Sequence, residues 1–165
     1  VQAVEVDPVA HSYALRNIDR LPLGAAVSLH LADLRGALHE LDGTVDVVVA
    51  NPPYVPLTHA PRLDPEVREH DPAGAVFGGA DGLDGPRLVV AAAARLLRPG
   101  GLLVMEHDDS HGESAPALLR RGVEWEDVAD HRDLSGRPRY LTARRATTRT
   151  ATPSGETVPR PDECA

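Results

Sequence analysis

The sequence predicts an α/β fold built on a doubly wound, mostly parallel sheet, and two observations carry this prediction. Short runs of Val, Leu and Ala with the length of strands alternate along the chain with segments that have the apolar spacing of helices. The last two predicted strands, residues 125–131 and 139–145, follow each other without a helix, so one of them should run antiparallel. In such sheets, ligands bind beyond the carboxyl ends of the strands.

The composition fits one domain whose core is built from Leu, Val and Ala. The chain has 165 residues, of which 42% are apolar and only 3% aromatic. The single cysteine, Cys164, excludes a disulfide framework and a cysteine-rich metal site. No apolar run approaches the roughly 20 residues that span a bilayer, and no signal peptide opens the chain, so we expect a soluble cytoplasmic protein.

The charge distribution weighs against a nucleic-acid backbone as the main partner. The formal net charge is −8, whereas nucleic-acid-binding proteins usually carry a basic patch or stripe. The only dense basic cluster lies near the end of the predicted fold and consists of Arg137, Arg139, Arg144 and Arg145.

The N-terminal part predicts a strand followed by a helix. Residues 2–6 have the composition of a buried strand, and Asp7-Pro8 supplies an N-cap with proline at the first helical position. Ala10, Ala14 and Ile18 continue an apolar stripe at helical spacing. Because a domain rarely begins inside a core strand, we expect a further portion before residue 1.

The remaining elements are placed by periodicity and by proline and glycine. We expect strands at residues 26–31, 45–50 and 102–105, helices at 34–41, 88–97 and 114–121, and a proline-rich loop at about 51–65. Pro99-Gly100-Gly101 should stop the second of these helices. The domain therefore spans residues 1–145, and residues 146–165, which have no periodicity, should form a disordered tail.

The strongest chemical signal is Asn51-Pro52-Pro53-Tyr54, which directly follows the apolar strand 45–50. Two consecutive prolines fix φ and remove two backbone donors, which leaves carbonyl oxygens without competing N–H groups. The side-chain oxygen of Asn51 and the carbonyl of Pro52 can accept the two hydrogens of a planar NH₂ group. The ring of Tyr54 can stack on the flat group that carries it, and the alternative interpretation is a proline-rich turn after a strand.

These four residues, which we call the cradle, suit methyl transfer to nitrogen. An amide or exocyclic amine nitrogen is a poor nucleophile because its lone pair is delocalised. Two acceptors would shift electron density onto that nitrogen and stabilise its developing positive charge, while proximity to a sulfonium methyl supplies much of the remaining rate. No general base is clearly needed, since the amide proton becomes acidic only after methylation.

The tetrapeptide resembles the motif of methyltransferases that act on planar amino groups, and the surrounding chain resembles the HemK/PrmC family. That family methylates the glutamine of the Gly-Gly-Gln motif in class I peptide-chain release factors. The resemblance runs from about Gln2 to Arg145. It rests on the order and spacing of several segments, namely residues 4–8 with Ala14 and Asn17, then 46–54, 69–79, 81–84, 97–101 and 133–137.

The resemblance implies S-adenosylmethionine as cofactor and a Rossmann-like sheet. Asn51, Pro52 and Tyr54 would be catalytic, and together with Pro53 they would bind the substrate amide. Glu5 would accept the ribose hydroxyls of the cofactor and Asp33 its adenine amino group, with Asn51 bordering the same ligand. The alternative roles are a solvated strand end for Glu5 and a helix N-cap for Asp33, while Asp7 is better suited to capping its helix.

The strand end at Glu106 also matches a glutamate of the family. The segment that follows, residues 107–111 (His-Asp-Asp-Ser-His), invites comparison with a metal site. The other histidines are scattered in sequence, so we predict no metal and interpret the segment as a polar loop over the active site.

The sequence departs from the family at its beginning. It contains neither the N-terminal helical domain nor the Gly-rich loop after the first strand that grips the methionine part of the cofactor; Gly78-Gly79-Ala80-Asp81-Gly82 follows no strand and is a different element. We therefore expect the first strand of the sheet to be missing from this chain. Two other functions stay open: methylation of adenine or guanine amino groups in nucleic acid, and a non-catalytic remnant that binds a partner.

Overall fold

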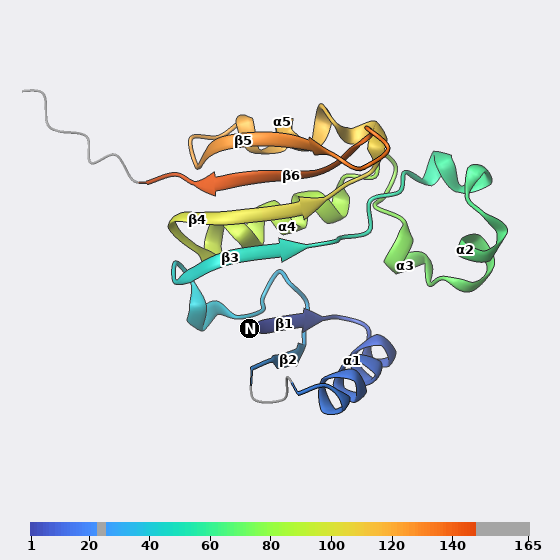
Figure 1. The fold of residues 1–165 in the computed structure, drawn as a ribbon, viewed down its shortest axis with the longest axis horizontal. Helices are drawn as coiled ribbons and strands as arrows, with labels where there is room; N and C mark the ends of the chain where they lie inside the picture. The colour runs from blue at the N-terminus through green and yellow to red at the C-terminus, as the bar shows by residue number, and fades with distance from the viewer. Residues whose placement is uncertain (23–25, 148–165) are drawn as a thin grey trace, which may run out of the picture.

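The computed structural model describes residues 1–22 and 26–147. Helices and strands alternate along most of this length (Figure 1). The elements are β1 (Gln2–Glu5), α1 (Pro8–Arg20), β2 (Ser28–Leu31), β3 (Val45–Ala50), α2 (Pro65–His70), α3 (Ala73–Val76), α4 (Asp84–Leu96), β4 (Leu97–Glu106), α5 (Ser114–Arg120), β5 (Trp125–Arg132) and β6 (Pro138–Arg145), with 3₁₀ helices η1 (His39–Leu41), η2 (Leu57–Arg62) and η3 (Asp109–His111).

The strands form two sheets. The larger has the order β3-β4-β6-β5, in which β3 and β4 are parallel and β6 runs antiparallel to both of its neighbours. The smaller consists of the parallel pair β1-β2, with Gln2 opposite Ser28 and Glu5 opposite Leu31. The predicted α/β class, with parallel strands and one antiparallel strand near the C-terminal end, is confirmed. The carboxyl ends of β1, β3 and β4 point to the same side of the molecule (Figure 1).

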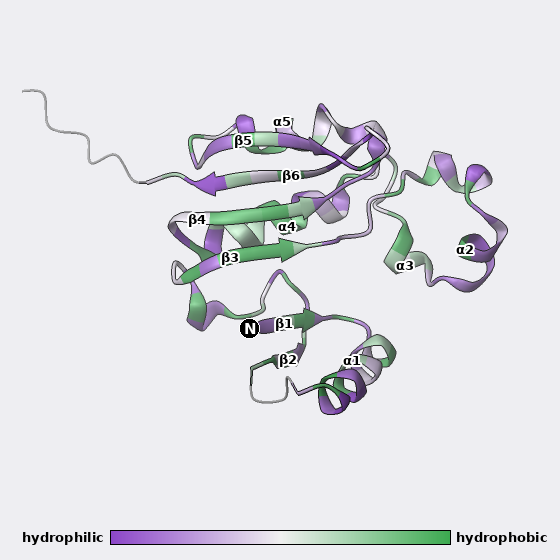
Figure 2. Cartoon of the chain, in the orientation of Figure 1, coloured by the Kyte–Doolittle hydropathy of each residue, from purple (hydrophilic) through white to green (hydrophobic). Residues whose placement is uncertain are grey.

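The core lies between the larger sheet and the helices α4 and α5. Leu103 and Met105 of β4, Leu119 of α5 and Leu141 of β6 are fully buried in one cluster, together with Ala93 of α4. The hydropathy colouring shows β3 and β4 as the most continuously apolar strands (Figure 2). Aliphatic burial of this kind is what the low aromatic content predicts. The core thus holds β3 and β4, the two strands whose carboxyl ends carry Asn51 and Glu106.

The predicted burial of the first strand is only partly correct. In β1 the residues from Ala3 to Glu5 are half-buried, and Val6 beyond its end is 66% exposed. Among the described residues, β1 pairs only with β2 and β3 only with β4, so each keeps one edge without a partner strand. Val49 of β3 is 74% exposed, on the face of the strand opposite to Val48 and Ala50, which pack against the core. The expected first strand concerns sequence before residue 1 and stays a prediction.

The N-terminus of α1 forms as predicted. Oδ1 of Asp7 accepts hydrogen bonds from the backbone N–H groups of Val9 and Ala10, both at 2.8 Å, and Pro8 occupies the first turn. The side chain therefore satisfies two of the helix's free donors. None of the residues of α1 is fully buried, so its apolar stripe covers the small sheet only loosely.

The predicted helix at 34–41 is wrong, because only the 3₁₀ turn η1 forms there. Oδ1 of Asp33 accepts a hydrogen bond from the backbone N–H of Arg35, which makes a turn instead of a helix start. Leu38 adopts a left-handed conformation with φ of 59°. The carbonyl of Ala37 accepts a hydrogen bond of 2.7 Å from Arg95 of α4, so a distant contact replaces a helical one.

Other boundaries also differ from the sequence predictions. The proline-rich loop contains η2 and is followed by α2 and α3, which periodicity did not indicate. Helix α4 ends at Leu96, and Pro99-Gly100-Gly101 belong to β4, where Gly100 takes a φ of 75°. The predicted tail, residues 146–165, lies outside the described residues except for its first two positions.

Candidate active site

The cradle Asn51-Pro52-Pro53-Tyr54 directly follows the last residue of β3, where the sequence predicts it. The side chain of Asn51 is exposed, Pro52 is buried, and Pro53 and Tyr54 are half-buried. A pocket of about 180 Å³ opens on these four residues, and Val55, Ala75 and Val76 complete its wall. Because Ala75 and Val76 belong to α3, this unpredicted helix forms the side of the pocket that faces the cradle.

Tyr54 is held by a partner that the sequence does not reveal. Its hydroxyl donates a hydrogen bond of 2.7 Å to Oε1 of Glu106, at the end of β4. Burial, together with this hydrogen bond and the negative charge of Glu106, raises the pKa of Tyr54 to about 12. The hydroxyl is therefore a donor at neutral pH and not a base, and it ties the cradle to the neighbouring strand.

Arg139 of β6 brings a positive charge to the same place. Its guanidinium forms an ion pair of 3.1 Å with Oδ2 of Asp133 and also acts electrostatically on Tyr54 and Glu106. The carboxylate of Glu106 thus accepts a hydrogen bond from the hydroxyl of Tyr54 and lies near the positive charge of Arg139. This arrangement keeps Glu106 oriented and leaves the ring of Tyr54 at the mouth of the pocket.

Glu5 and Asp33 lie at the carboxyl ends of adjacent strands of the small sheet. Oε1 of Glu5 accepts a hydrogen bond of 2.8 Å from the backbone N–H of Asp7, and Asp33 is paired with Arg35 at 3.3 Å. Both carboxylates are bound by only one local partner within the part of the chain that the structure describes. In that part, no hydrogen bond or ion pair joins either residue to the cradle; their roles toward a cofactor stay predictions.

The segment 107–111, which we predicted as a polar loop over the active site, forms a loop that contains η3, and both of its histidines are buried. His107 is 0% exposed; its Nδ1 donates to the carbonyl of Asp108 and its Nε2 to Oδ1 of Asp130, both at 2.9 Å. His107 therefore links the end of β4 to β5 and serves the fold.

His111 has a different environment. Its Nε2 donates a hydrogen bond of 2.9 Å to the carbonyl of Asp81, and burial lowers its pKa. Its Nδ1 is buried without a hydrogen-bond partner in the described structure, which fits a neutral ring. Among residues 1–22 and 26–147, no group of three or more potential ligands is placed to hold a metal ion.

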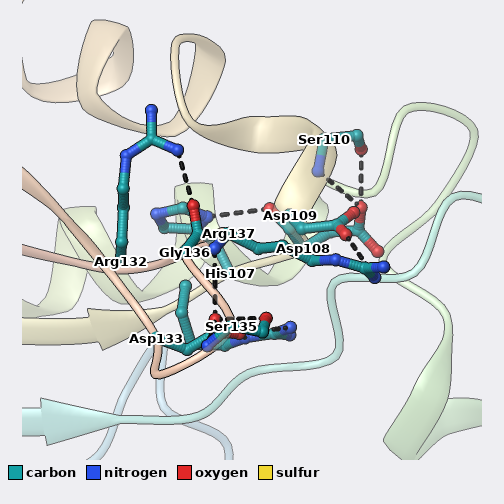
Figure 3. Close-up of polar contacts among 10 residues, drawn as sticks. His107, Asp108, Asp109, Ser110, Arg132, Asp133, Ser135, Gly136 and Arg137 are labelled. Carbon is teal, nitrogen blue, oxygen red and sulfur yellow. Dashed lines mark hydrogen bonds and ion pairs between the residues drawn. The ribbon is translucent and has the colours of Figure 1, made fainter.

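A network of polar contacts joins the loop after β4, residues 107–111, to the turn between β5 and β6 (Figure 3). Asp108 accepts hydrogen bonds from the backbone and hydroxyl of Ser110, and Arg137 reaches Oδ2 of Asp109 at 3.3 Å. Asp133 accepts from Ser135 and from the N–H of Arg137, so its pKa lies well below the ordinary value. The turn between β5 and β6 is thereby fastened to the loop after β4.

The dense arginine cluster is bound to its own chain. Arg137 and Arg139 form the ion pairs described above, Arg144 donates to the carbonyl of Gly100, and Arg145 donates to the carbonyls of Ala94 and Glu124. Within the described residues, each of these guanidinium groups is hydrogen-bonded or ion-paired to a strand end or a turn.

Comparison with known proteins places the chain among methyltransferases. The release factor glutamine methyltransferase of Streptomyces coelicolor is 47% identical over 146 residues, which cover 88% of this chain and 50% of that protein. The protein of the same name from Mycobacterium leprae is 49% identical over 140 residues, covering 82% and 47%. The chain thus spans about half the length of the curated relatives it matches. No protein-family profile matches it.

Solved structures support the fold alone. A methyltransferase from Pyrococcus furiosus superimposes with a TM-score of 0.60 at 21% identity, covering 89% of this chain and 63% of that one. An O-methyltransferase family protein from Burkholderia thailandensis gives 0.55 at 18%, covering 89% and 44%. The Rossmann-like fold that the resemblance implies is confirmed. No helix among the described residues has the length and hydropathy needed to cross a membrane.

Proposed function

Because this chain is a relative of the release factor glutamine methyltransferases over about half their length, we propose that it forms the catalytic part of such an enzyme. The reaction transfers a methyl group from S-adenosylmethionine to N5 of the glutamine in the Gly-Gly-Gln motif of class I release factors. The protein acts in the cytoplasm, where this protein substrate is found. The observation that carries the proposal is the cradle Asn51-Pro52-Pro53-Tyr54, with its pocket, at the carboxyl end of β3.

The cradle residues act on the amide nitrogen. The side-chain oxygen of Asn51 and the carbonyl of Pro52 accept its two hydrogens and stabilise the positive charge that develops on nitrogen. Pro52 and Pro53 offer no N–H group that could compete for these acceptors. The ring of Tyr54, fixed through Glu106, covers the flat amide group and limits its rotation.

The carboxylates of the small sheet suit a nucleoside. Glu5 and Asp33 end or follow adjacent parallel strands, and each has an oxygen beyond the one that takes up a local backbone N–H. Glu5 would hold the ribose hydroxyls and Asp33 the adenine amino group, as acceptors of hydrogen bonds. S-adenosylmethionine, when bound there, supplies an electrophilic methyl group on its sulfonium.

Methylation of a nucleobase is the rival reaction for the same cradle, because a flipped base also presents a planar amino group. The formal net charge of −8 weighs against it, because a phosphate backbone is usually bound by a basic patch or stripe. A non-catalytic role would predict binding of a partner without turnover, which the experiment below separates from the enzyme.

The proposal is tested with Asn51→Ala in the protein that carries this chain. Loss of one preorganised acceptor should lower the rate of methyl transfer about 10²–10³-fold while changing cofactor affinity only a few-fold. The readout is mass spectrometry of the Gly-Gly-Gln peptide of a release factor, beside duplex DNA and RNA as acceptors. Glu126→Ala, at an exposed position of β5, is the control and should keep the full rate. Unchanged release-factor methylation by Asn51→Ala would refute the assignment.

A further inference from the structure

The glycine-rich segment Gly78–Gly85 lies against the backbone of the cradle. It begins after Phe77, which pairs with Val55 in an isolated parallel bridge. The backbone N–H of Gly78 donates to the carbonyl of Val55, and that of Leu57 donates to the carbonyl of Gly79, both at 3.0 Å. The segment is therefore hydrogen-bonded to the residues that directly follow Tyr54.

Three of its glycines leave no room for a side chain because the cradle backbone occupies that space. A methyl group added at Gly78 would lie 2.5 Å from the carbonyl oxygen of Gly82 and 2.7 Å from that of Pro53, and one at Gly85 would overlap the Pro53 oxygen. A methyl group at Gly82 would overlap the carbonyl oxygen of Tyr54. Interiors pack too densely for such overlaps to be absorbed without movement of the backbone.

Side chains hold the segment in this position from two sides. Arg87 of α4 forms ion pairs with Asp81 at 2.6 Å and Asp84 at 3.1 Å. His111 donates to the carbonyl of Asp81, and its Cε1 would lie 2.7 Å from a methyl group at Gly82. The hydrogen bond from Arg87 lowers the pKa of Asp81 to about 2, so this contact persists at neutral pH.

We propose that Gly78, Gly82 and Gly85 are positioning residues, which set the backbone of Pro53 and Tyr54 and thereby aim the cradle at its acceptor amide. The role in methyl transfer rests on the proposed function. The effect of the glycines on the position of the cradle does not rest on it. The hydrogen bond from Tyr54 to Glu106 depends on that position and can be followed without methyl transfer. Displacement of Pro53 and Tyr54 would lengthen that bond and lower the pKa of the phenol.

Gly85→Ala tests close approach alone, since the φ of Gly85 is not in the left-handed region, whereas Gly82 has a φ of 76°. The test measures tyrosinate absorbance during an alkaline titration. In Gly85→Ala, the ionisation of Tyr54 near pH 12 (the late ionisation) should be lost, while the circular dichroism at neutral pH should stay unchanged. Gly122→Ala is the control, because a methyl group there meets only ordinary contacts of 3.9 Å or more. It should keep the late ionisation.

If Gly85→Ala does not fold, Arg87→Ala decides the question. Arg87 is exposed, and its loss should loosen the segment and move the late ionisation to lower pH. A late ionisation that stays in place in a folded Gly85→Ala, or in Arg87→Ala when the glycine variant is unfolded, overturns the proposal. In the protein that carries the chain, Gly85→Ala should reduce kcat at least tenfold with cofactor affinity unchanged. If the unaltered protein transfers no methyl group, the proposed function fails while the titration still decides the geometry.

Discussion

The hydroxyl of Tyr54 donates a 2.7 Å hydrogen bond to Oε1 of Glu106, and this bond joins the cradle after β3 to the end of β4. The two residues are 52 positions apart in the sequence. Because β3 and β4 are parallel neighbours, their carboxyl ends lie side by side and bring the two side chains together. Tyr54 is therefore oriented by the sheet and not by its own loop.

Tyr54→Phe should remove a tyrosine that ionises near pH 12. The raised pKa favours the neutral phenol in the folded state, so its contribution to stability is complete below the ordinary pKa of 10.0 and is lost as the pH rises toward about 12. Tyrosinate absorbance during an alkaline titration measures this step. Tyr13→Phe, at an exposed position of α1, should retain it. A late step that survives in Tyr54→Phe would contradict the assignment of the raised pKa.

Glu5→Ala should weaken binding of S-adenosylmethionine to the protein that carries the chain. Each hydrogen bond to a charged acceptor contributes about 1.5–3 kcal/mol, and Glu5 is proposed to accept from the ribose. Asp7→Ala is the matched comparison, because Asp7 caps α1 and its loss should cost about 0.5–2 kcal/mol of stability with little effect on affinity. Calorimetric titration measures the affinity for S-adenosylmethionine. If Asp7→Ala weakens this affinity and Glu5→Ala does not, the ribose contact belongs to Asp7.

Asp130→Ala should destabilise the fold. Asp130 accepts from Nε2 of His107, which is 0% exposed and would be left with an unpaired buried donor. Loss of a hydrogen bond to a charged group costs about 1.5–3 kcal/mol. Urea denaturation followed by circular dichroism gives the change. Glu126→Ala, at an exposed position of the same strand, should leave stability almost unchanged, and an equal midpoint for both variants would rule out a structural role for His107.

Leu103→Ala should be among the most damaging core substitutions. Leu103 lies in the centre of β4, is 0% exposed and belongs to the main cluster. Truncation of a buried leucine costs about 2–5 kcal/mol, because a cavity replaces its packing contacts. Val123→Ala, at a position that is 94% exposed, should change the free energy of unfolding by less than about 0.5 kcal/mol. Similar losses for the two variants would mean that β4 is not the centre of the core.

Several local features could be predicted from the sequence. Asp7 caps α1, residues 45–50 form β3 with the predicted bounds, and Asn51 follows that strand directly. These features depend on residues a few positions apart, such as a capping carboxylate with proline after it or an apolar run that ends at a polar turn. The family resemblance rests on the same local segments, and the curated relatives support it.

The tertiary structure alone decided the rest. Residues 34–41 have helical spacing but form a turn, in which the carbonyl of Ala37 accepts a hydrogen bond from Arg95 of α4. The sequence indicates only a polar loop at residues 107–111, yet both of its histidines are buried: His107 is bonded to Asp130 of β5, and His111 to the carbonyl of Asp81 in the glycine-rich segment. Spacing within one segment carries no information about such partners, since they come from other elements and meet only when the sheet has assembled. The sequence by itself therefore determined the elements and the identity of the cradle, while the contacts that orient Tyr54 arose from the fold.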